Sequence, residues 1–135
     1  MSKTLRELRA RDIMATAVQW TTPAENLLAA GRRMAEHGLR SLLVHGEDPT
    51  ELPGIVTSKD IVTLLGTHDP ELLAELRVGD VMTRPAICVP AQTNLRDCIN
   101  LMRMSSVRRL PVLDGTTVIG VLSSTDIFRR ALADA

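Results

Sequence analysis

The spacing of apolar residues along this chain predicts two amphipathic helices of the same kind. In residues 95–102, apolar side chains recur at i, i+3, i+4 and i+7, after Thr93 as a candidate N-terminal cap. Residues 27–34 repeat that spacing with smaller side chains, including Ala30 and Gly31, which indicates closer helix packing there. The pattern therefore occurs once in each half of the chain.

Short apolar runs bounded by Pro, Gly and polar residues predict the strands. One strand precedes each amphipathic helix, and a hairpin of two strands follows it. A final helix in each half begins near Thr57 or Ser123 and ends near Leu65 or Leu132, with Gly66 as a C-terminal stop for the first. The predicted strands are residues 18–21, 41–45 and 54–56 in the first half, and residues 86–89, 109–113 and 118–122 in the second.

Residues 12–45 align with residues 80–113 without a gap, which identifies an internal duplication. After the central hairpin the alignment resumes with a slightly shorter offset, and the change falls in a loop, where a difference in length costs little. The identical pairs include Asp12 and Asp80, Met14 and Met82, Asn26 and Asn94, Arg40 and Arg108, Gly54 and Gly120, Ser58 and Ser124, and Asp60 and Asp126.

The length of the chain bounds its domain organisation. A half of about 60 residues buries only about 60% of its unfolded surface, so we expect the two halves to fold as one compact module with one core and with two related clefts between them. We assign residues 1–66 to the first repeat with an N-terminal segment, residues 67–78 to a connector, and residues 79–135 to the second repeat.

Composition narrows the function classes. The 16 basic residues balance the 16 acidic ones, which argues against a nucleic acid or an anionic membrane surface as partner. No run approaches the roughly 20 apolar residues that span a bilayer, and the N-terminal residues lack the apolar stretch of a signal peptide. With only Cys88 and Cys98 as cysteines, these features predict a cytoplasmic protein.

The candidate chemistry lies where the final helix of each half begins. Here Thr57, Ser58 and Asp60, and their copies Ser123, Ser124 and Asp126, follow a strand that opens on a glycine. Backbone N–H groups and the helix dipole attract anions at a helix start, a hydroxyl donates to phosphate, and a carboxylate accepts from ribose hydroxyls. The same spacing also forms a capping box, worth about 1 kcal/mol of helix stability, so both interpretations stay open at this point.

The duplicated unit resembles a pair of CBS domains, the family named after cystathionine beta-synthase. Each copy opens on Asp12, Ile13, Met14 or Asp80, Val81, Met82, and residues 107–114 and 120–127 follow the family pattern nearly throughout. The resemblance covers about residues 10–133. It implies an α/β fold of the α+β type, with two strand-helix-strand-strand-helix repeats packed through their sheets in pseudo-two-fold symmetry.

The resemblance implies an adenosine nucleotide site and favours the ligand interpretation for Asp126. The first copy departs from the family pattern, because Leu43, Ser41 and Gly46 replace Pro111, Arg109 and Asp114. Whether the first copy binds a ligand therefore stays an open question.

Arginine matches phosphate oxygens bidentately, and only one of two successive strand residues faces a given cleft. Together with the six helix-start residues, the predicted nucleotide-binding residues are Arg108, Arg109, Ala86, Ile87 and Gly120 of the better copy, and Arg40, Ala17 and Val18. Ala86, Ile87, Ala17 and Val18 are candidate walls for adenine, and core packing is the alternative for them. Gly120 and Gly54 would let a ligand or neighbouring backbone approach their strands closely.

Other chemistry finds little support in the sequence. His37, His45 and His68 lack a metal-ligand spacing, and neither cysteine is arranged as a nucleophile with a base. We therefore predict no metal site, no required cofactor and no catalytic residues.

The leading hypothesis is a non-catalytic regulatory module that binds AMP, ADP, ATP or S-adenosylmethionine in clefts between the repeats and signals to an unknown effector protein. Surplus apolar residues around residues 61–65 indicate a homodimer, unless the connector covers them. The alternative is a structural CBS pair that binds no ligand and acts through its dimer interface.

Overall fold

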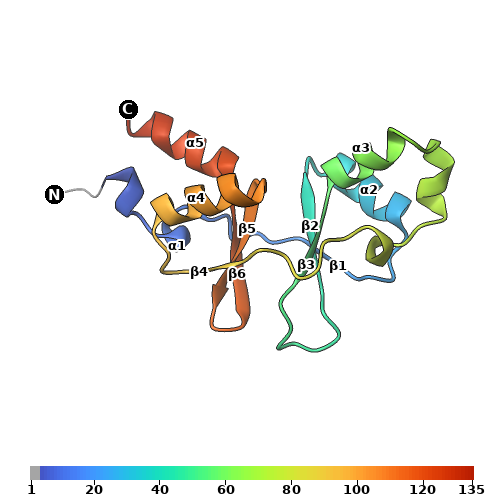
Figure 1. Cartoon of the computed structure of the whole chain (residues 1–135), viewed down its shortest axis with the longest axis horizontal. Helices are drawn as coiled ribbons and strands as arrows, with labels where there is room; N and C mark the ends of the chain where they lie inside the picture. The colour runs from blue at the N-terminus through green and yellow to red at the C-terminus, as the bar shows by residue number, and fades with distance from the viewer. Residues whose placement is uncertain (1–3) are drawn as a thin grey trace. The chain divides into compact units, whose positions relative to one another are not determined.

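Each half of the duplicated sequence contributes one three-stranded sheet and two helices, as the apolar pattern predicted. The computed structural model describes residues 4–135 and divides into two compact units (Figure 1). One unit comprises Gln19–Ala86, and the other comprises the chain up to Val18 together with Ile87–Ala135. The predicted α/β fold, with one strand-helix-strand-strand-helix repeat in each half, is confirmed.

In the unit of Gln19–Ala86 the strands have the order β1-β2-β3. Strand β1 pairs parallel with β2, and β2 pairs antiparallel with β3, with Ser41 opposite Thr57. Two 3-10 helices, η2 and η3, follow α3. The elements are β1 (Trp20–Thr21), α2 (Leu27–Glu36), β2 (Ser41–Val44), β3 (Gly54–Thr57), α3 (Ser58–Leu65), η2 (Pro70–Ala74) and η3 (Val78–Asp80).

The second unit repeats this topology with the order β4-β5-β6. Strand β4 pairs parallel with β5, and β5 pairs antiparallel with β6, with Arg109 opposite Ser123. The elements are η1 (Leu5–Glu7), α1 (Ala10–Ile13), β4 (Val89–Pro90), α4 (Leu95–Ser105), β5 (Arg109–Asp114), β6 (Thr117–Ser123) and α5 (Ser124–Ala133).

The helix boundaries follow from their capping residues. Asn26 and Asn94 cap α2 and α4, with Oδ1 accepting from the amides of Ala29 at 3.2 Å and Asp97 at 2.9 Å. The prediction of Thr93 as the cap of α4 was therefore wrong by one residue, because Asn94 directly precedes the first turn and its Oδ1 reaches the Asp97 amide. The predicted end of α3 is confirmed at Leu65, with Gly66 as the C-cap.

Each unit has its own hydrophobic cluster, whereas the sequence led us to expect one common core. In one cluster, Leu110 and Val112 alternate along β5 and meet Leu122 of β6, residues of α4 and Ile127 of α5. Two helices therefore cover the same face of the sheet, since alternate strand residues share a face. The other cluster repeats this arrangement with Leu27, Ala30, Met34, Leu42, Val44, Val56 and Val78.

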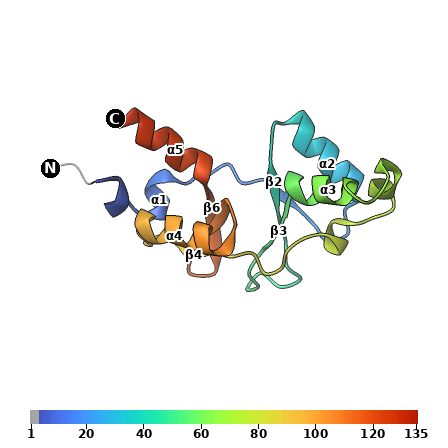
Figure 2. The same ribbon diagram turned by 45° about the horizontal axis from the view of Figure 1, so that its top comes forward.

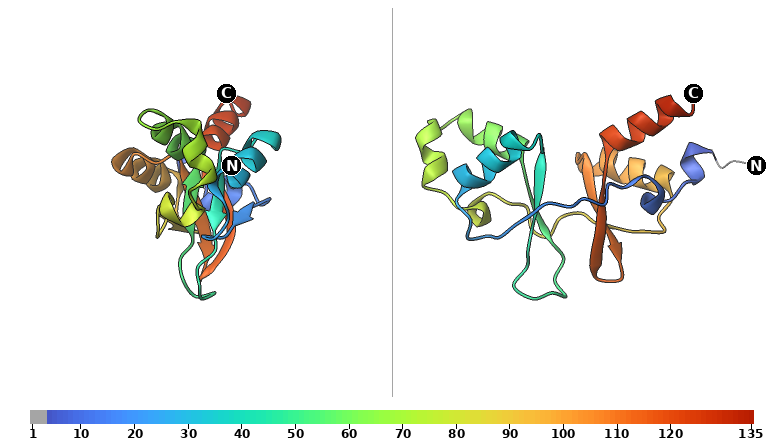
Figure 3. Two further views of the ribbon diagram at one scale, coloured as in Figure 1. Left: turned by 90° about the vertical axis from the view of Figure 1, so that its right-hand side faces the viewer. Right: turned by 180° about the vertical axis from the view of Figure 1, so that it is seen from behind.

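The opening segment of each repeat packs in the unit that holds the other repeat's sheet. Ala15 pairs antiparallel with Val121, and Thr83 pairs in the same way with Ile55. Ala10 of α1 is fully buried in the cluster of α4 and α5, and Figures 2 and 3 show α1 beside those elements. The compact units and the repeats therefore divide the chain differently, and the assignment of residues 67–78 as a connector stays a prediction.

Gly120 is required by this crossing of the opening segment over β6. A Cβ atom at Gly120 would lie 2.6 Å from the Met14 sulfur and 2.8 Å from the Ala15 carbonyl oxygen. Gly54 is approached in the same way by the Thr83 carbonyl oxygen, at 3.1 Å from an added Cβ. The sequence offered two reasons for these glycines, the approach of a ligand or of neighbouring backbone, and the approach of backbone explains both Gly120 and Gly54.

Candidate functional site

The two candidate sites begin with a side-chain cap at the start of α3 and of α5. The Asp60 amide donates to Thr57 Oγ1 at 3.2 Å, and the Asp126 amide donates to Ser123 Oγ at 3.1 Å. Both capping residues are in extended conformation at the end of a strand, so the strand leads directly into the helix. The predicted cap is therefore present in both copies.

A backbone hydrogen bond also joins each helix start to the arginine immediately before the neighbouring strand. The Ser58 amide donates to the Arg40 carbonyl at 2.9 Å, and the Ser124 amide donates to the Arg108 carbonyl at 2.9 Å. Two of the first three amides of each helix are thus already bonded within the chain. An anion there would depend on side chains more than the sequence alone led us to expect.

The two carboxylates differ in what they bind. Asp60 Oδ2 accepts the Thr57 backbone amide at 2.8 Å, which completes a capping box. Asp126 Oδ2 instead accepts the Ser123 hydroxyl at 2.7 Å, and no reciprocal backbone bond forms. A hydroxyl can rotate to another acceptor, whereas a backbone amide cannot, so the Asp126 carboxylate is the easier one to redirect to a ligand.

The arginines of the second copy lie close to this helix start. Arg109 is the cross-strand partner of Ser123, so their side chains share one face of the sheet. Arg108 lies immediately before β5 and is exposed, while Arg109 is half-buried, as expected for neighbours that point to opposite faces. In the first copy Ser41 takes the position of Arg109, opposite Thr57, so only Arg40 remains.

The candidate adenine walls lie in the segments that join the two units. Ala86 is buried, and its amide donates to the Pro53 carbonyl at 2.8 Å, while Ile87 is exposed. Ala17 is exposed and Val18 is half-buried, in a tight turn in which the Val18 amide donates to the Thr16 carbonyl at 3.0 Å. Their contact with adenine stays a prediction.

The cysteine environments disfavour a thiolate nucleophile. Burial raises the pKa of the Cys88 thiol to about 11. Burial, followed by the charge of Asp97, raises the pKa of the Cys98 thiol to about 11 as well. Both thiols are therefore protonated at neutral pH, whereas the thiolate is the reactive form.

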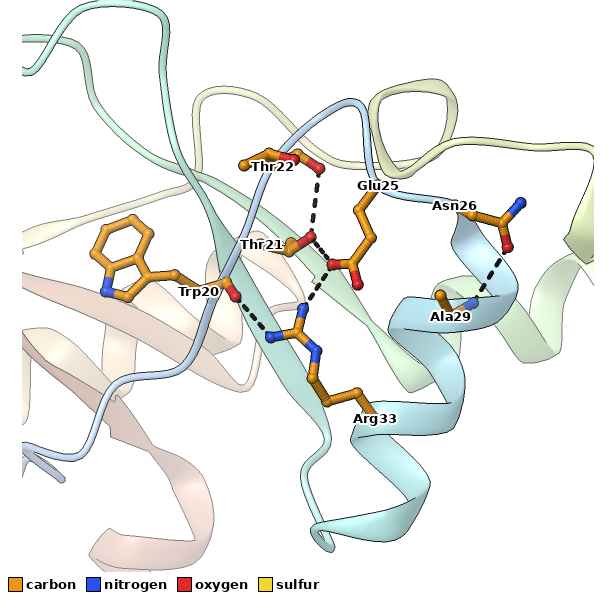
Figure 4. A network of polar contacts seen from close by, with 7 residues as sticks. All are labelled: Trp20, Thr21, Thr22, Glu25, Asn26, Ala29 and Arg33. Atoms are coloured by element: carbon orange, nitrogen blue, oxygen red, sulfur yellow. Dashed lines mark hydrogen bonds and ion pairs between the residues drawn. The ribbon is translucent and has the colours of Figure 1, made fainter.

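A polar network that the sequence analysis missed ties α2 to β1 (Figure 4). Arg33 Nη1 donates to the Trp20 carbonyl at 2.9 Å, and Arg33 Nη2 donates to Glu25 Oε1 at 2.6 Å, where the Thr21 hydroxyl also donates. The Arg33 side chain is therefore half-buried and holds the start of α2 against β1. The missed signal was Thr21, a polar residue in an otherwise apolar strand position.

Two aromatic rings stack at the edge of the same sheet. The Trp20 and His45 rings have centroids 4.3 Å apart and planes within 8° of parallel. Arg84 Nη2 donates to the His45 carbonyl at 2.7 Å, which anchors the segment after the second opening motif. Over residues 4–135, no three His, Cys, Asp or Glu side chains gather in a way that could hold a metal ion.

Comparison with known proteins identifies the family. The CBS domain family matches residues 10–67 and 78–133, so the chain belongs to this family. Hypoxic response protein 1 of Mycobacterium tuberculosis is 32% identical over 123 residues, which cover 90% of this chain and 83% of that protein.

Solved structures give the same result. A hexameric CBS-CP12 protein from bloom-forming cyanobacteria superposes with a TM-score of 0.82 at 30% identity, over 90% of this chain and 66% of the other. Hypoxic response protein I, crystallised with two coordinated zinc ions, superposes with a TM-score of 0.72 at 30% identity, over 91% and 98% of the chains.

Membership has a general functional consequence. Pairs of CBS domains are generally regulatory, non-catalytic, ligand-binding modules. Within the part of the chain that the structure describes, no helix has the length and apolar character needed to cross a membrane.

Proposed function

We propose that the chain is a regulatory module that binds an adenosine nucleotide at the start of α5 and signals the bound state to a partner protein. Ser123 and Ser124 donate to the phosphate, Asp126 accepts from the ribose hydroxyls, and Arg109 or Arg108 pairs with the phosphate charge. Adenine packs against the apolar segments at Ile87, Ala17 or Val18, which belong to the same compact unit as α5. No catalytic group takes part.

The observation that carries this proposal is the difference between the two carboxylates. Asp60 accepts from the Thr57 backbone amide, so its withdrawal would remove that bond from a fixed donor. Asp126 accepts from the Ser123 hydroxyl, which can turn to a phosphate oxygen when Asp126 turns to a ribose. The start of α5 can therefore exchange its internal bond for two ligand bonds.

The same comparison ranks the two copies. The first copy combines a completed capping box with the loss of the arginine opposite its capping residue, because Ser41 stands where the second copy has Arg109. We therefore propose that Thr57, Ser58, Asp60 and Arg40 bind the nucleotide more weakly than the second copy does.

Self-association forms part of the proposal. Phe128 and Leu132, four residues apart on α5, have exposed fractions of 63% and 60%, and Val62 is the counterpart of Phe128 on α3. Ile61 and Leu64 of α3, by contrast, pack against the buried cluster of that unit, as Leu73 and Leu76 also do. Part of the surplus apolar surface is thus covered within the unit, and the exposed remainder supports a homodimer.

Thermal unfolding against a panel of AMP, ADP, ATP, S-adenosylmethionine and GTP tests the proposal. A ligand at 100 times its dissociation constant stabilises the bound fold by about 2.7 kcal/mol, which raises the midpoint by several degrees. Asp126→Ala is expected to abolish the shift, while the matched variant Asp60→Ala retains most of it. A panel without any shift would favour a ligand-free scaffold that acts through the apolar surface of α5.

A further inference from the structure

We infer that a second, separate anion pocket lies between η1 and the start of α4, and that it accepts the phosphate group of a small phosphomonoester. The pocket has a volume of about 280 Å³ and is lined by Thr4, Arg6, Glu7, Arg9, Asn94 and Arg96. All of these residues belong to one compact unit. Three arginines thus line one small hollow, and nothing in the nucleotide proposal uses them.

The duplication shows which lining residues serve the scaffold. At the constant offset of the duplication, Glu7, Arg9 and Asn94 correspond to the identical residues Glu75, Arg77 and Asn26. Arg9 Nη1 donates to the Gln92 carbonyl at 2.7 Å, and Arg77 Nη1 donates to the Ala24 carbonyl at 2.9 Å. These residues hold the same local structure in both copies.

The remaining lining residues distinguish the copies. Thr4, Arg6 and Arg96 have the counterparts Leu72, Ala74 and Leu28 in the other copy. The same backbone scaffold is therefore stable with apolar residues at these three positions, so folding does not require the two additional arginines. A chain that places them around a hollow gains a site for negative charge.

The pocket also contains polar groups with little internal use. In the other copy, Asn26 Nδ2 donates to the Ala74 carbonyl at 2.7 Å. The corresponding Asn94 amide group has no hydrogen-bond partner among residues 4–135, and neither has the Arg6 guanidinium. Arg96 Nε lies 3.8 Å from Asp97 Oδ1, a contact between side chains with exposed fractions of 61% and 59%, which is a weak pair.

The charges favour an anion. The lining carries three arginines against one carboxylate, that of Glu7, and Asp97 lies outside the lining. The start of α4 adds little by itself, because the Leu95 and Asp97 amides are already bonded to the Leu8 carbonyl and to Asn94 Oδ1. The guanidinium groups therefore dominate recognition, and Glu7 moderates the affinity.

The dimensions and the donors define the class of ligand. Guanidinium forks match the oxygens of phosphate in a bidentate manner, and the Asn94 amide and the Thr4 hydroxyl can donate to the same group. The volume lies just below the range of roughly 300–1,000 Å³ typical of sites for larger ligands. The pocket thus suits a phosphate group on a small metabolite.

The test measures binding of inorganic phosphate at constant ionic strength, with chloride as the reference anion. Amide chemical shifts in two-dimensional NMR locate the binding, and thermal unfolding measures its strength. The double variant Arg6→Ala, Arg96→Leu installs the residues of the other copy, and Arg32→Ala, Arg103→Ala removes the same charge from exposed positions elsewhere. Asp126→Ala separates this site from the proposed nucleotide site.

The expected result is a set of phosphate-induced shifts at residues 4–9 and 94–97. The Arg6, Arg96 variant weakens phosphate binding at least about tenfold, since each charged hydrogen bond contributes more than a neutral one. The Arg32, Arg103 variant and Asp126→Ala leave binding unchanged, and Glu7→Gln strengthens it. Shifts confined to residues 123–126, an equal response to chloride, or equal loss in both arginine variants would overturn the inference.

Discussion

Replacing the two corresponding aspartates separately, without ligand, distinguishes a cap from a binding residue. Asp60→Ala removes a carboxylate that accepts the Thr57 amide at 2.8 Å. Asp126→Ala removes one that accepts the Ser123 hydroxyl at 2.7 Å, while the Asp126 amide keeps its bond to Ser123 Oγ. The two substitutions are chemically identical, and they occur at equivalent positions of one duplicated scaffold.

The expected costs differ because the lost bonds differ. Asp60→Ala loses a hydrogen bond from a backbone amide to a charged acceptor and a favourable charge in the first helical turn, about 1.5–2 kcal/mol together for a half-buried residue. Asp126→Ala loses the helix-dipole contribution and a bond that the Ser123 hydroxyl replaces with water, about 0.5–1 kcal/mol.

Urea denaturation followed by circular dichroism measures both free energies of unfolding. Asp60→Asn and Asp126→Asn are the controls, since asparagine keeps an oxygen acceptor but removes the charge. The first control recovers part of the loss at Asp60. If both alanine variants lost the same stability, or if Asp126→Ala lost more, Asp126 would be a cap like Asp60 and the ranking of the two sites would be wrong.

Four further predictions follow from individual contacts. Burial raises the pKa of Cys88 and Cys98 to about 11. Alkylation at pH 7.5 is therefore expected to be roughly 300-fold slower than for an ordinary cysteine, and its rate is expected to rise about tenfold per pH unit up to that pKa. Fast labelling of the folded chain at neutral pH would contradict this. Gly120→Ala is expected to destabilise the fold by about 1–3 kcal/mol in urea, because the added Cβ would lie 2.8 Å from the Ala15 carbonyl oxygen; an unchanged midpoint would show that the opening segment moves away freely. Arg33→Ala removes the bonds to the Trp20 carbonyl and to Glu25, and it is expected to lower the free energy of unfolding by about 1 kcal/mol. This figure is discounted because both charged side chains are about a third exposed. Heat unfolding of Arg33→Ala beside Arg32→Ala checks this, and equal unfolding midpoints for the two variants would show that the network contributes nothing. Phe128→Glu places a charge in the exposed stripe of α5 and is expected to shift a homodimer to monomer in light scattering; a wild-type monomer, or an unaffected dimer, would rule out this surface.

The sequence predicted the elements well where a local pattern determines them. The amphipathic spacing of α4 and the turn residues Asp114 and Gly115 specify a helix and a hairpin without information from the rest of the fold. The edge strands were less accurate: residues 86–89 and 18–21 were predicted, and the structure has Val89–Pro90 and Trp20–Thr21. Such short strands are defined by pairing with β5 or β2, which apolar content alone does not reveal.

The arrangement of the repeats could not be read from the chain. Nothing in the residues around Asp12 or Asp80 indicates that each opening segment packs on the other repeat's sheet. Gly120 came nearest, because a strand glycine signals a close approach without identifying what approaches. The same limit applied to the two carboxylates, whose spacing is equal in sequence and whose partners differ only in three dimensions.

A crystal structure of the chain grown with a saturating adenosine nucleotide tests the central claim most directly. The account predicts nucleotide density at the start of α5, with ribose hydroxyls within hydrogen-bond distance of the Asp126 carboxylate and with the Ser123 hydroxyl turned away from Asp126 toward phosphate. Density without a nucleotide at that helix, and with the bond between Ser123 and Asp126 intact, would contradict it.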